Sequence, residues 1–212
     1  MYAVPVDYTH PVEALVPGVQ GRVLAVLART GSELTMRGVA ELAGVSPQQA
    51  SVVLGRLVEL GVVERRDVPP VALVRLVKEN LAAQAVLAVA RLRQGAIERL
   101  KALAARIEPA PASLVVFGSF ARGEAGTHSD VDVLAVRPSP LSANAYDGWT
   151  DSLGLWVDLA TRALGNPVNL VEASVEDFPR LLSAEAPSFW TDVAHHGIVL
   201  VGASLGDLAP AA

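Results

Sequence analysis

The apolar positions from residue 18 to residue 45 predict two helices at the start of a domain. Over 21–30 they fall at helical spacing, namely at Val23, Val26 and Leu27. Over 36–44 the apolar residues Val39 and Leu42 share one face of a second helix. Thr35 is placed to cap the start of this helix, and Gly44 to close its end.

A third helix and a hairpin follow. Ser46 and Pro47 supply an N-cap and a first-turn proline for a helix over 47–61. We expect its apolar residues to point inward, namely Val52, Val53, Leu57 and Leu60. Residues 62–66 and 71–77 alternate at period two around a turn at 67–70, as the strands of a hairpin do.

This order resembles the winged helix-turn-helix domains of bacterial MarR- and ArsR-type repressors. The resemblance rests on VAELAGVSPQQASVVLGRLVELGVVERR, within a mainly α domain that we assign to residues 18–78. It implies that the third helix enters the major groove of DNA and that the hairpin meets phosphates. The contacting residues would be Gln48, Gln49, Ser51 and Arg56 on the helix and Arg65 and Arg66 on the hairpin. Residues 18–80 carry a net charge of only +2, so a protein-docking role is the alternative.

Residues 1–17 are punctuated by proline and are predicted to form an extended arm. Residues 79–108 carry an apolar stripe at three- and four-residue steps, which predicts one long linker helix or two helices with a break at Gly95. Because so long a stripe needs a partner surface, a dimerisation helix, and with it a homodimer, is the alternative. The segment EPAPAS, 108–113, marks the start of a second domain over 109–212.

The second domain has an α/β pattern and contains the segment VVFGSFARGEAGTHSDVDVLAV. A buried strand leads to Gly118 and Ser119. Because glycine has no side chain, backbone N–H groups at Gly118 can approach a phosphate closely. Ten residues later a second strand carries Asp130 and Asp132, which point to the same face of that strand. Two adjacent carboxylates suit Mg²⁺, a hard cation that prefers oxygen ligands. A phosphate-binding turn beside a Mg²⁺ site is typical of phosphoryl or nucleotidyl transfer.

This motif resembles the signature of the minimal nucleotidyltransferases in the DNA polymerase beta-like superfamily, which includes antitoxin partners of HEPN ribonucleases. The resemblance covers residues 113–202 and implies an α/β (α+β) nucleotidyltransferase fold with a mixed sheet. It implies that Gly118 and Ser119 hold the triphosphate of an NTP and that Asp130 and Asp132 bind Mg²⁺. Arg122 follows the turn and is either a phosphate ligand or a surface residue.

The sequence departs from this family at the third acidic position. Members usually carry Asp or Glu in the third strand, whereas PVNLVEAS places Asn169 there. An asparagine offers a carbonyl oxygen to a metal, but it carries no charge and is a poor proton acceptor. Glu172 is near in sequence, but three residues along a strand place it on the opposite face from Asn169. Glu124 and Asp158 are the alternative acids. The departure leaves three functions open: a Mg²⁺-dependent nucleotidyltransferase, a nucleotide-sensing regulator, and an antitoxin with a separate toxin partner.

Composition excludes some kinds of metal site and bears on where the protein is located. The chain of 212 residues has a formal net charge of −5 and no cysteine, so thiolate metal sites and disulfides are excluded. The N-terminus lacks the pattern of a signal peptide, and no uncharged apolar run reaches the roughly 18 residues of a membrane span. We therefore expect a cytoplasmic protein without a membrane partner.

Overall fold

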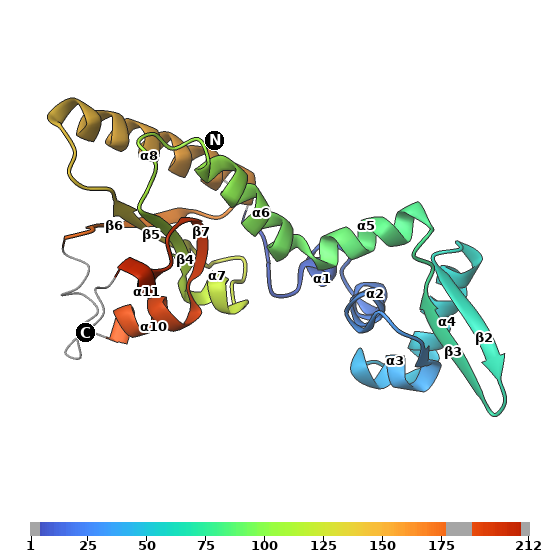
Figure 1. Ribbon diagram of the computed structural model, residues 1–212. Helices are drawn as coiled ribbons and strands as arrows, with labels where there is room; N and C mark the ends of the chain where they lie inside the picture. Colours follow the sequence, from blue (N-terminus) through green and yellow to red (C-terminus); the bar gives the residue numbers. More distant parts are fainter. Residues whose placement is uncertain (1–4, 177–187, 209–212) are drawn as a thin grey trace. The chain divides into compact units, whose positions relative to one another are not determined.

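The computed structural model describes residues 5–176 and 188–208. They form two compact units (Figure 1). The N-terminal unit is His10–Leu92. The C-terminal unit joins the described residues before His10 to those from Arg93 onward.

The N-terminal unit has the predicted order of helices and a hairpin. This order is preceded by a short helix over residues 11–15, so this part of the predicted extended arm is helical. The elements of the unit are α1 (Pro11–Leu15), α2 (Val19–Thr30), β1 (Leu34–Thr35), α3 (Met36–Leu42), α4 (Pro47–Glu59), β2 (Val63–Val68), β3 (Val71–Leu76) and α5 (Leu81–Ala90). The strand β3 pairs antiparallel with both β2 and β1. The predicted caps are present: the Thr35 hydroxyl accepts from the Gly38 N–H, and Ser46 forms a capping box with Gln49.

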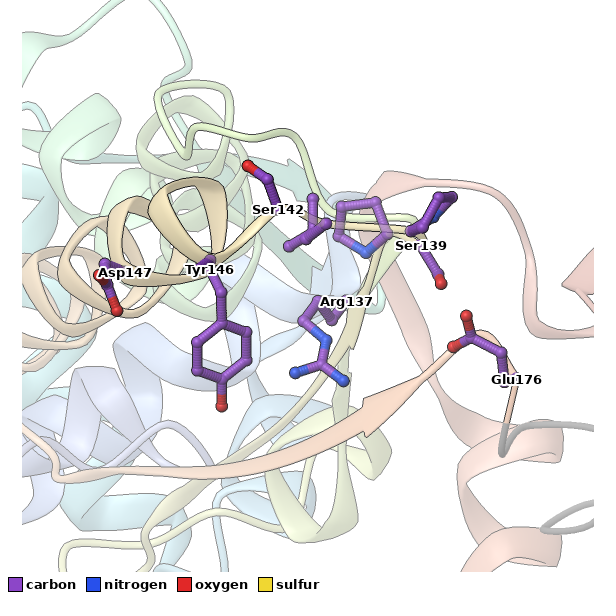
Figure 2. Close-up of a pocket in the computed structure, with 10 residues that line it drawn as sticks. Arg137, Ser139, Ser142, Tyr146, Asp147 and Glu176 are labelled. Carbon is purple, nitrogen blue, oxygen red and sulfur yellow. The ribbon is translucent and has the colours of Figure 1, made fainter.

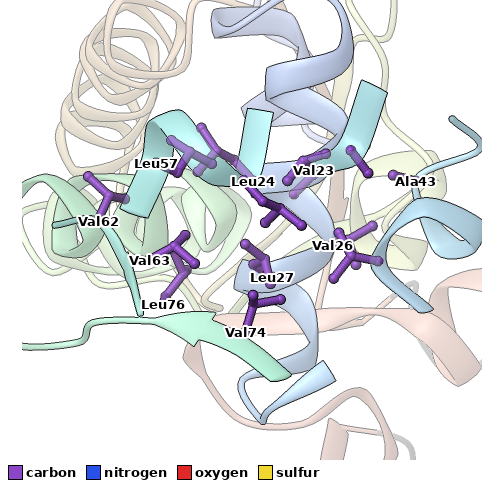
Figure 3. Packing of buried hydrophobic residues seen from close by; sticks show 14 of the residues in the cluster. Val23, Leu24, Val26, Leu27, Ala43, Leu57, Val62, Val63, Val74 and Leu76 are labelled. Carbon is purple, nitrogen blue, oxygen red and sulfur yellow. The ribbon is translucent and has the colours of Figure 1, made fainter. Parts of the chain in front are cut away.

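The hydrophobic core of this unit is centred on α2 (Figure 3). Four apolar side chains of this helix are at most 3% exposed, namely Val23, Leu24, Val26 and Leu27. Figure 3 shows them beside Val74 and Leu76 of β3. The hairpin therefore packs against the helices.

Two of the inward positions predicted for the third helix are wrong. Val52 is 53% exposed and Leu60 is 68% exposed, whereas Leu57 is buried as expected. The buried face of α4 is Ala50, Leu54 and Leu57, spaced four and three residues apart. Val52 therefore lies outside this face, and Leu60 is the C-cap residue, already beyond the helix.

The stripe predicted as a linker over 79–108 forms two helices, α5 and α6 (Leu92–Ala104). The interruption is at Arg91 and not at Gly95. In α5, Ala83 is fully buried in the core of the N-terminal unit. The helix α6 belongs, from Arg93 onward, to the C-terminal unit.

The C-terminal unit is built on a four-stranded sheet in the order β6-β5-β4-β7. Its strands are β4 (Ser113–Phe117), β5 (Val131–Arg137), β6 (Val168–Ser174) and β7 (Ile198–Gly202). The strand β4 pairs antiparallel with β5 and β7, and β5 pairs parallel with β6. This confirms the predicted mixed sheet.

Helices lie on both sides of this sheet (Figure 1). They are α7 (Gly118–Arg122), α8 (Ala143–Leu164), α10 (Ser188–His196) and α11 (Leu205–Leu208). Residues of α10 and α11 pack on one face of β4 and β5, and α8 lies on the opposite side. The three tryptophans are buried, as expected for core residues: Trp149, Trp156 and Trp190. In the described parts of the chain, no helix is both long and apolar enough to span a bilayer.

Candidate active site

The Gly118 turn lies directly against Asp132. The strand β4 ends at Phe117, which is paired with Asp132 in β5. Gly118 then has a φ of +69°, a left-handed conformation that residues with a side chain rarely adopt. A Cβ atom at this position would come within 2.6 Å of the Asp132 Oδ2 atom. Glycine is therefore required here by the backbone conformation and by the nearby carboxylate.

The structure brings Asp130, Asp132 and Asn169 together. Asp130 immediately precedes β5, and Asn169 in β6 is the register partner of Asp132. The Asn169 Nδ2 atom donates to Asp130 Oδ2 at 3.0 Å and, more weakly, to Asp132 Oδ1 at 3.5 Å. The neutral amide thus occupies the third position of the site and bridges the two acids.

The electrostatics of Asp132 favour binding of a cation. Burial raises the pKa of the Asp132 carboxyl above its ordinary value, and the negative charge of Asp130 raises it further. The hydrogen bond from Asn169 and the charge of Arg122 oppose this shift of the pKa. A divalent cation would stabilise both ionised carboxylates, because its charge would offset the repulsion between Asp130 and Asp132 and the partial burial of Asp132.

The donor set fits Mg²⁺ held by few protein ligands. Asp130 and Asp132 offer carboxylate oxygens. Rotation of the Asn169 side-chain amide by about 180°, which exchanges its two terminal atoms, would also present its carbonyl oxygen to the metal. Within the described residues, no group of three or more His, Cys, Asp or Glu side chains is placed to hold a metal. Mg²⁺ usually takes only one or two protein carboxylates and completes its shell with phosphate oxygens and water, so two acids match this ion.

Arg122 is held by two carboxylates. Its Nε donates to Glu124 Oε2 at 2.9 Å, and its Nη1 donates to both carboxylate oxygens of Asp192, at 3.0 and 3.1 Å. His196 Nδ1 lies 3.1 Å from Asp192 Oδ1. Asp192 as a partner of Arg122, and His196 as a neighbour of Asp192, were not predicted from the sequence. Nothing local indicates this contact, because 70 residues separate Asp192 from Arg122.

The alternative acids are engaged elsewhere or lie on other elements. Glu124 is paired with Arg122. Glu172 lies three residues after Asn169 in β6 and forms an ion pair with Arg137, with 3.5 Å between Nη1 and Oε1. Asp158 lies within α8.

A separate cavity of about 410 Å³ lies at the C-terminal end of β5, whereas Asp132 is near the start of this strand (Figure 2). It is lined by Arg137, Tyr146, Asp147, Glu176 and residues of the loop between β5 and α8, with Arg137 over the Tyr146 ring at 4.9 Å. Arg137 is five residues beyond Asp132, or roughly 17 Å along a strand. None of the residues predicted for the nucleotide site lines this cavity.

In the N-terminal unit, the predicted DNA-contacting residues of α4 are exposed: Gln48, Gln49, Ser51 and Arg56. The Gln49 side chain is engaged in the capping box, where its Oε1 accepts from the Ser46 N–H at 3.0 Å. Gln48 and Gln49 also line a hollow of about 320 Å³ together with Val19, Val52 and Val53. The surface of α4 is therefore more apolar than the sequence pattern predicted.

The arginines of the hairpin are paired with acids of their own unit. Arg65 contacts Asp67 at 2.8 Å, and Arg75 is paired with Glu64. Arg66 Nε donates to Glu33 Oε1 at 3.2 Å, and this hydrogen bond lowers the pKa of the Glu33 carboxyl. The positive charge of the hairpin is thus largely compensated in this structure.

Comparison with known proteins agrees with the division into two units. Residues 16–72 match the family model described as MarR family, and residues 97–180 match the one described as nucleotidyltransferase domain. No curated protein matches the chain.

Two solved structures are similar to half of the chain. One is a toxin-antitoxin crystallised with AMP-PNP, at 20% identity over 52% of this chain and 77% of that one, with a TM-score of 0.34. The other is a mutant of the toxin-antitoxin MntA-HpeT, at 18% identity over the same shares, also with a TM-score of 0.34. The two family matches together show that this chain carries a MarR-family winged-helix domain followed by a nucleotidyltransferase domain.

Proposed function

We propose that the C-terminal unit transfers a nucleoside monophosphate from an NTP to a hydroxyl acceptor, with Mg²⁺ as cofactor. The observation that carries this proposal is the convergence of Asp130, Asp132 and Asn169 beside the Gly118 turn. The acceptor is a protein side chain, an RNA end or a small molecule. In each case an acceptor oxygen bonds to the α-phosphorus, the bond from that phosphorus to the β-phosphate oxygen breaks, and pyrophosphate leaves.

Each residue has a defined task in this reaction. Asp130 and Asp132 would hold Mg²⁺, which would offset the charge of the phosphates and lower the pKa of the attacking hydroxyl. Gly118 lets the backbone approach the triphosphate, and the Ser119 hydroxyl donates to it. Arg122 supplies positive charge near Asp132. Asn169 orients the two acids but is a poor proton acceptor, so the acceptor's proton leaves to water.

The proposal predicts that NTP binding requires a divalent cation. Without one, Asp130 and Asp132 repel the phosphates, whereas Mg²⁺ would offset the negative charge of both groups. Calorimetric titration with ATP and with GTP, first in Mg²⁺ and then in EDTA, measures this requirement. Incubation with labelled NTPs then tests whether label passes to an acceptor. Equal binding in both conditions, or no binding in either, would contradict the proposal.

A second candidate function is a nucleotide sensor, either a transcriptional regulator or an antitoxin that acts on a separate toxin protein. The specific observation in its favour is Asn169, whose amide bridges the two carboxylates where the resembled family has an acid. Such a site binds NTP and Mg²⁺ but transfers nucleotide slowly. The winged-helix domain would then change its affinity for DNA with nucleotide occupancy.

We further propose that the hairpin binds DNA phosphates once its arginines are released from their ion pairs. Glu33→Gln frees Arg66 and should strengthen duplex binding. Each additional phosphate that the protein neutralises steepens the slope of log affinity against log salt concentration by about 0.9. Arg66→Gln, the matched variant, should not strengthen binding. Fluorescence anisotropy on one duplex at several salt concentrations measures both slopes, and identical slopes for both variants would show that Arg66 does not meet phosphate.

A further inference from the structure

The chain passes between the two units at two points, between Thr9 and His10 and between Leu92 and Arg93. Beside each crossing, on its C-terminal-unit side, a residue contacts the same stretch of chain, residues 118–129. We call this stretch the nucleotide loop, because it runs from the Gly118 turn to the residue before Asp130. All the contacts described next lie inside the C-terminal unit.

At the second crossing, Arg93 binds the carboxyl end of α7. Its Nε donates to the Phe120 carbonyl oxygen at 2.8 Å, and its Nη2 donates to the carbonyl of Ala121. The last carbonyl groups of a helix lack partners within the helix, and a helix of five residues is not stable in isolation. Arg93 therefore helps to hold α7, and with it the Gly118 turn at the start of α7, in place.

At the first crossing, Tyr8 binds the other side of the nucleotide loop. Its backbone N–H donates to the Ala125 carbonyl at 3.0 Å, and its ring packs edge-on against Phe120 at 4.9 Å. Its hydroxyl donates to the Leu164 carbonyl at 2.8 Å, and burial raises the pKa of Tyr8 to about 12. The Tyr8 side chain is therefore a fixed, neutral support for the loop.

The fully buried Asn166 extends this support to the end of the loop. Its Oδ1 accepts from the Val6 N–H at 2.9 Å, and its Nδ2 donates to the Ser129 carbonyl at 2.8 Å. Ser129 directly precedes Asp130. Residues before His10 thus reach the nucleotide loop at Ala125 directly and at Ser129 through Asn166.

We propose that Arg93 and Tyr8 are positioning residues of the nucleotide loop, and that through them NTP binding is coupled to the N-terminal unit. The inference rests on the proposed nucleotide site. A shift of the chain at either crossing alters the contacts that hold the loop. Conversely, a triphosphate that orders the loop stabilises the chain at both crossings. Thermodynamic coupling of this kind is reciprocal, so each unit affects ligand binding by the other.

The test uses the full chain and hydrogen–deuterium exchange, with and without ATP and Mg²⁺. In the native protein, ATP should slow exchange in the nucleotide loop and also in residues 81–97, which include the second crossing. Arg93→Ala should weaken ATP binding by about tenfold, within the usual range of coupling between sites. It should also abolish the slowing at 81–92 while leaving some slowing in the loop.

Two further variants separate positioning from a general loss of stability. Arg99→Ala removes an exposed arginine from the same helix and should leave both ATP affinity and the exchange pattern unchanged. Tyr8→Phe keeps the ring against Phe120 but loses the hydrogen bond to Leu164, so it should retain the fold and weaken the slowing in the nucleotide loop. Thermal unfolding of each variant confirms that it is folded at the temperature of the exchange measurement.

The outcomes distinguish this inference from the proposed function. Slowing by ATP that is confined to the C-terminal unit of the native protein would overturn the coupling and leave the nucleotide site standing. Arg93→Ala with native ATP affinity and a native exchange pattern would overturn the positioning role. No effect of ATP anywhere, at concentrations up to saturation of a typical NTP site, would overturn the proposed function and the coupling with it.

Discussion

Replacing Asp130 and Asp132 together with asparagine should abolish nucleotidyl transfer and leave the fold intact. Both residues would hold the metal, and metal stabilisation of charge in a transition state contributes several kcal/mol. A loss of about 4 kcal/mol corresponds to roughly a thousandfold lower rate. The shape of the site is preserved, because an asparagine carbonyl still accepts a hydrogen bond from the Asn169 amide.

The same replacement should not lower the stability of the metal-free protein. Because burial raises the pKa of Asp132 in the folded state, its ionised form is less favourable in the fold than in the unfolded chain. This unfavourable contribution is present above the folded-state pKa and absent below the unfolded-state pKa. A neutral asparagine removes it at neutral pH, so the Tm in EDTA should stay the same or rise.

Initial rates with labelled NTP at saturating Mg²⁺, together with Tm values in EDTA, measure both effects. Asp147→Asn is a matched control, because Asp147 lines the separate cavity at the other end of β5. It should retain the native rate. Native turnover in the double variant would mean that the metal site lies elsewhere.

Changing Asn169 to aspartate should raise the transfer rate by about tenfold or more if the native site is a degenerate sensor. The new carboxylate would stand where the Asn169 Nδ2 now lies, 3.0 Å from Asp130 Oδ2, and it would add a third anionic metal ligand. A tenfold gain requires only about 1.4 kcal/mol of transition-state stabilisation. The variant should also depend more steeply on Mg²⁺, because three carboxylates repel one another more strongly than two.

The rates of native, Asn169→Asp and Asn169→Ala proteins at saturating NTP and Mg²⁺ test this prediction. The alanine variant removes the amide without adding charge and should show no gain. If Asn169→Asp is no faster than the native protein while both are active, the native site is already a competent enzyme that uses Asn169. No transfer by either protein would count against the enzyme and leave the sensor.

Several features of the fold could be predicted because they are encoded locally. The three-helix and hairpin order followed from helical and period-two spacing, with Thr35, Ser46 and Pro47 marking helix starts. The Gly-Ser turn and the paired aspartates were recognisable because adjacent strand and turn residues are also adjacent in space. The same spacing could not decide which face of α4 is buried, because apolar residues lie on more than one of its sides.

Tertiary structure decided the remaining features of the candidate site. The pairing of Arg122 with Asp192, the bridge from Asn169 to both acids and the contacts of Tyr8 with Ala125 and Leu164 all join residues far apart in the sequence. They depend on the order and register of the strands and on the path of the chain within the C-terminal unit. The sequence by itself determined which local elements form and where the chemical groups lie along them. Which groups meet was decided only by packing, because hydrophobic periodicity specifies a buried face but not the element that covers it.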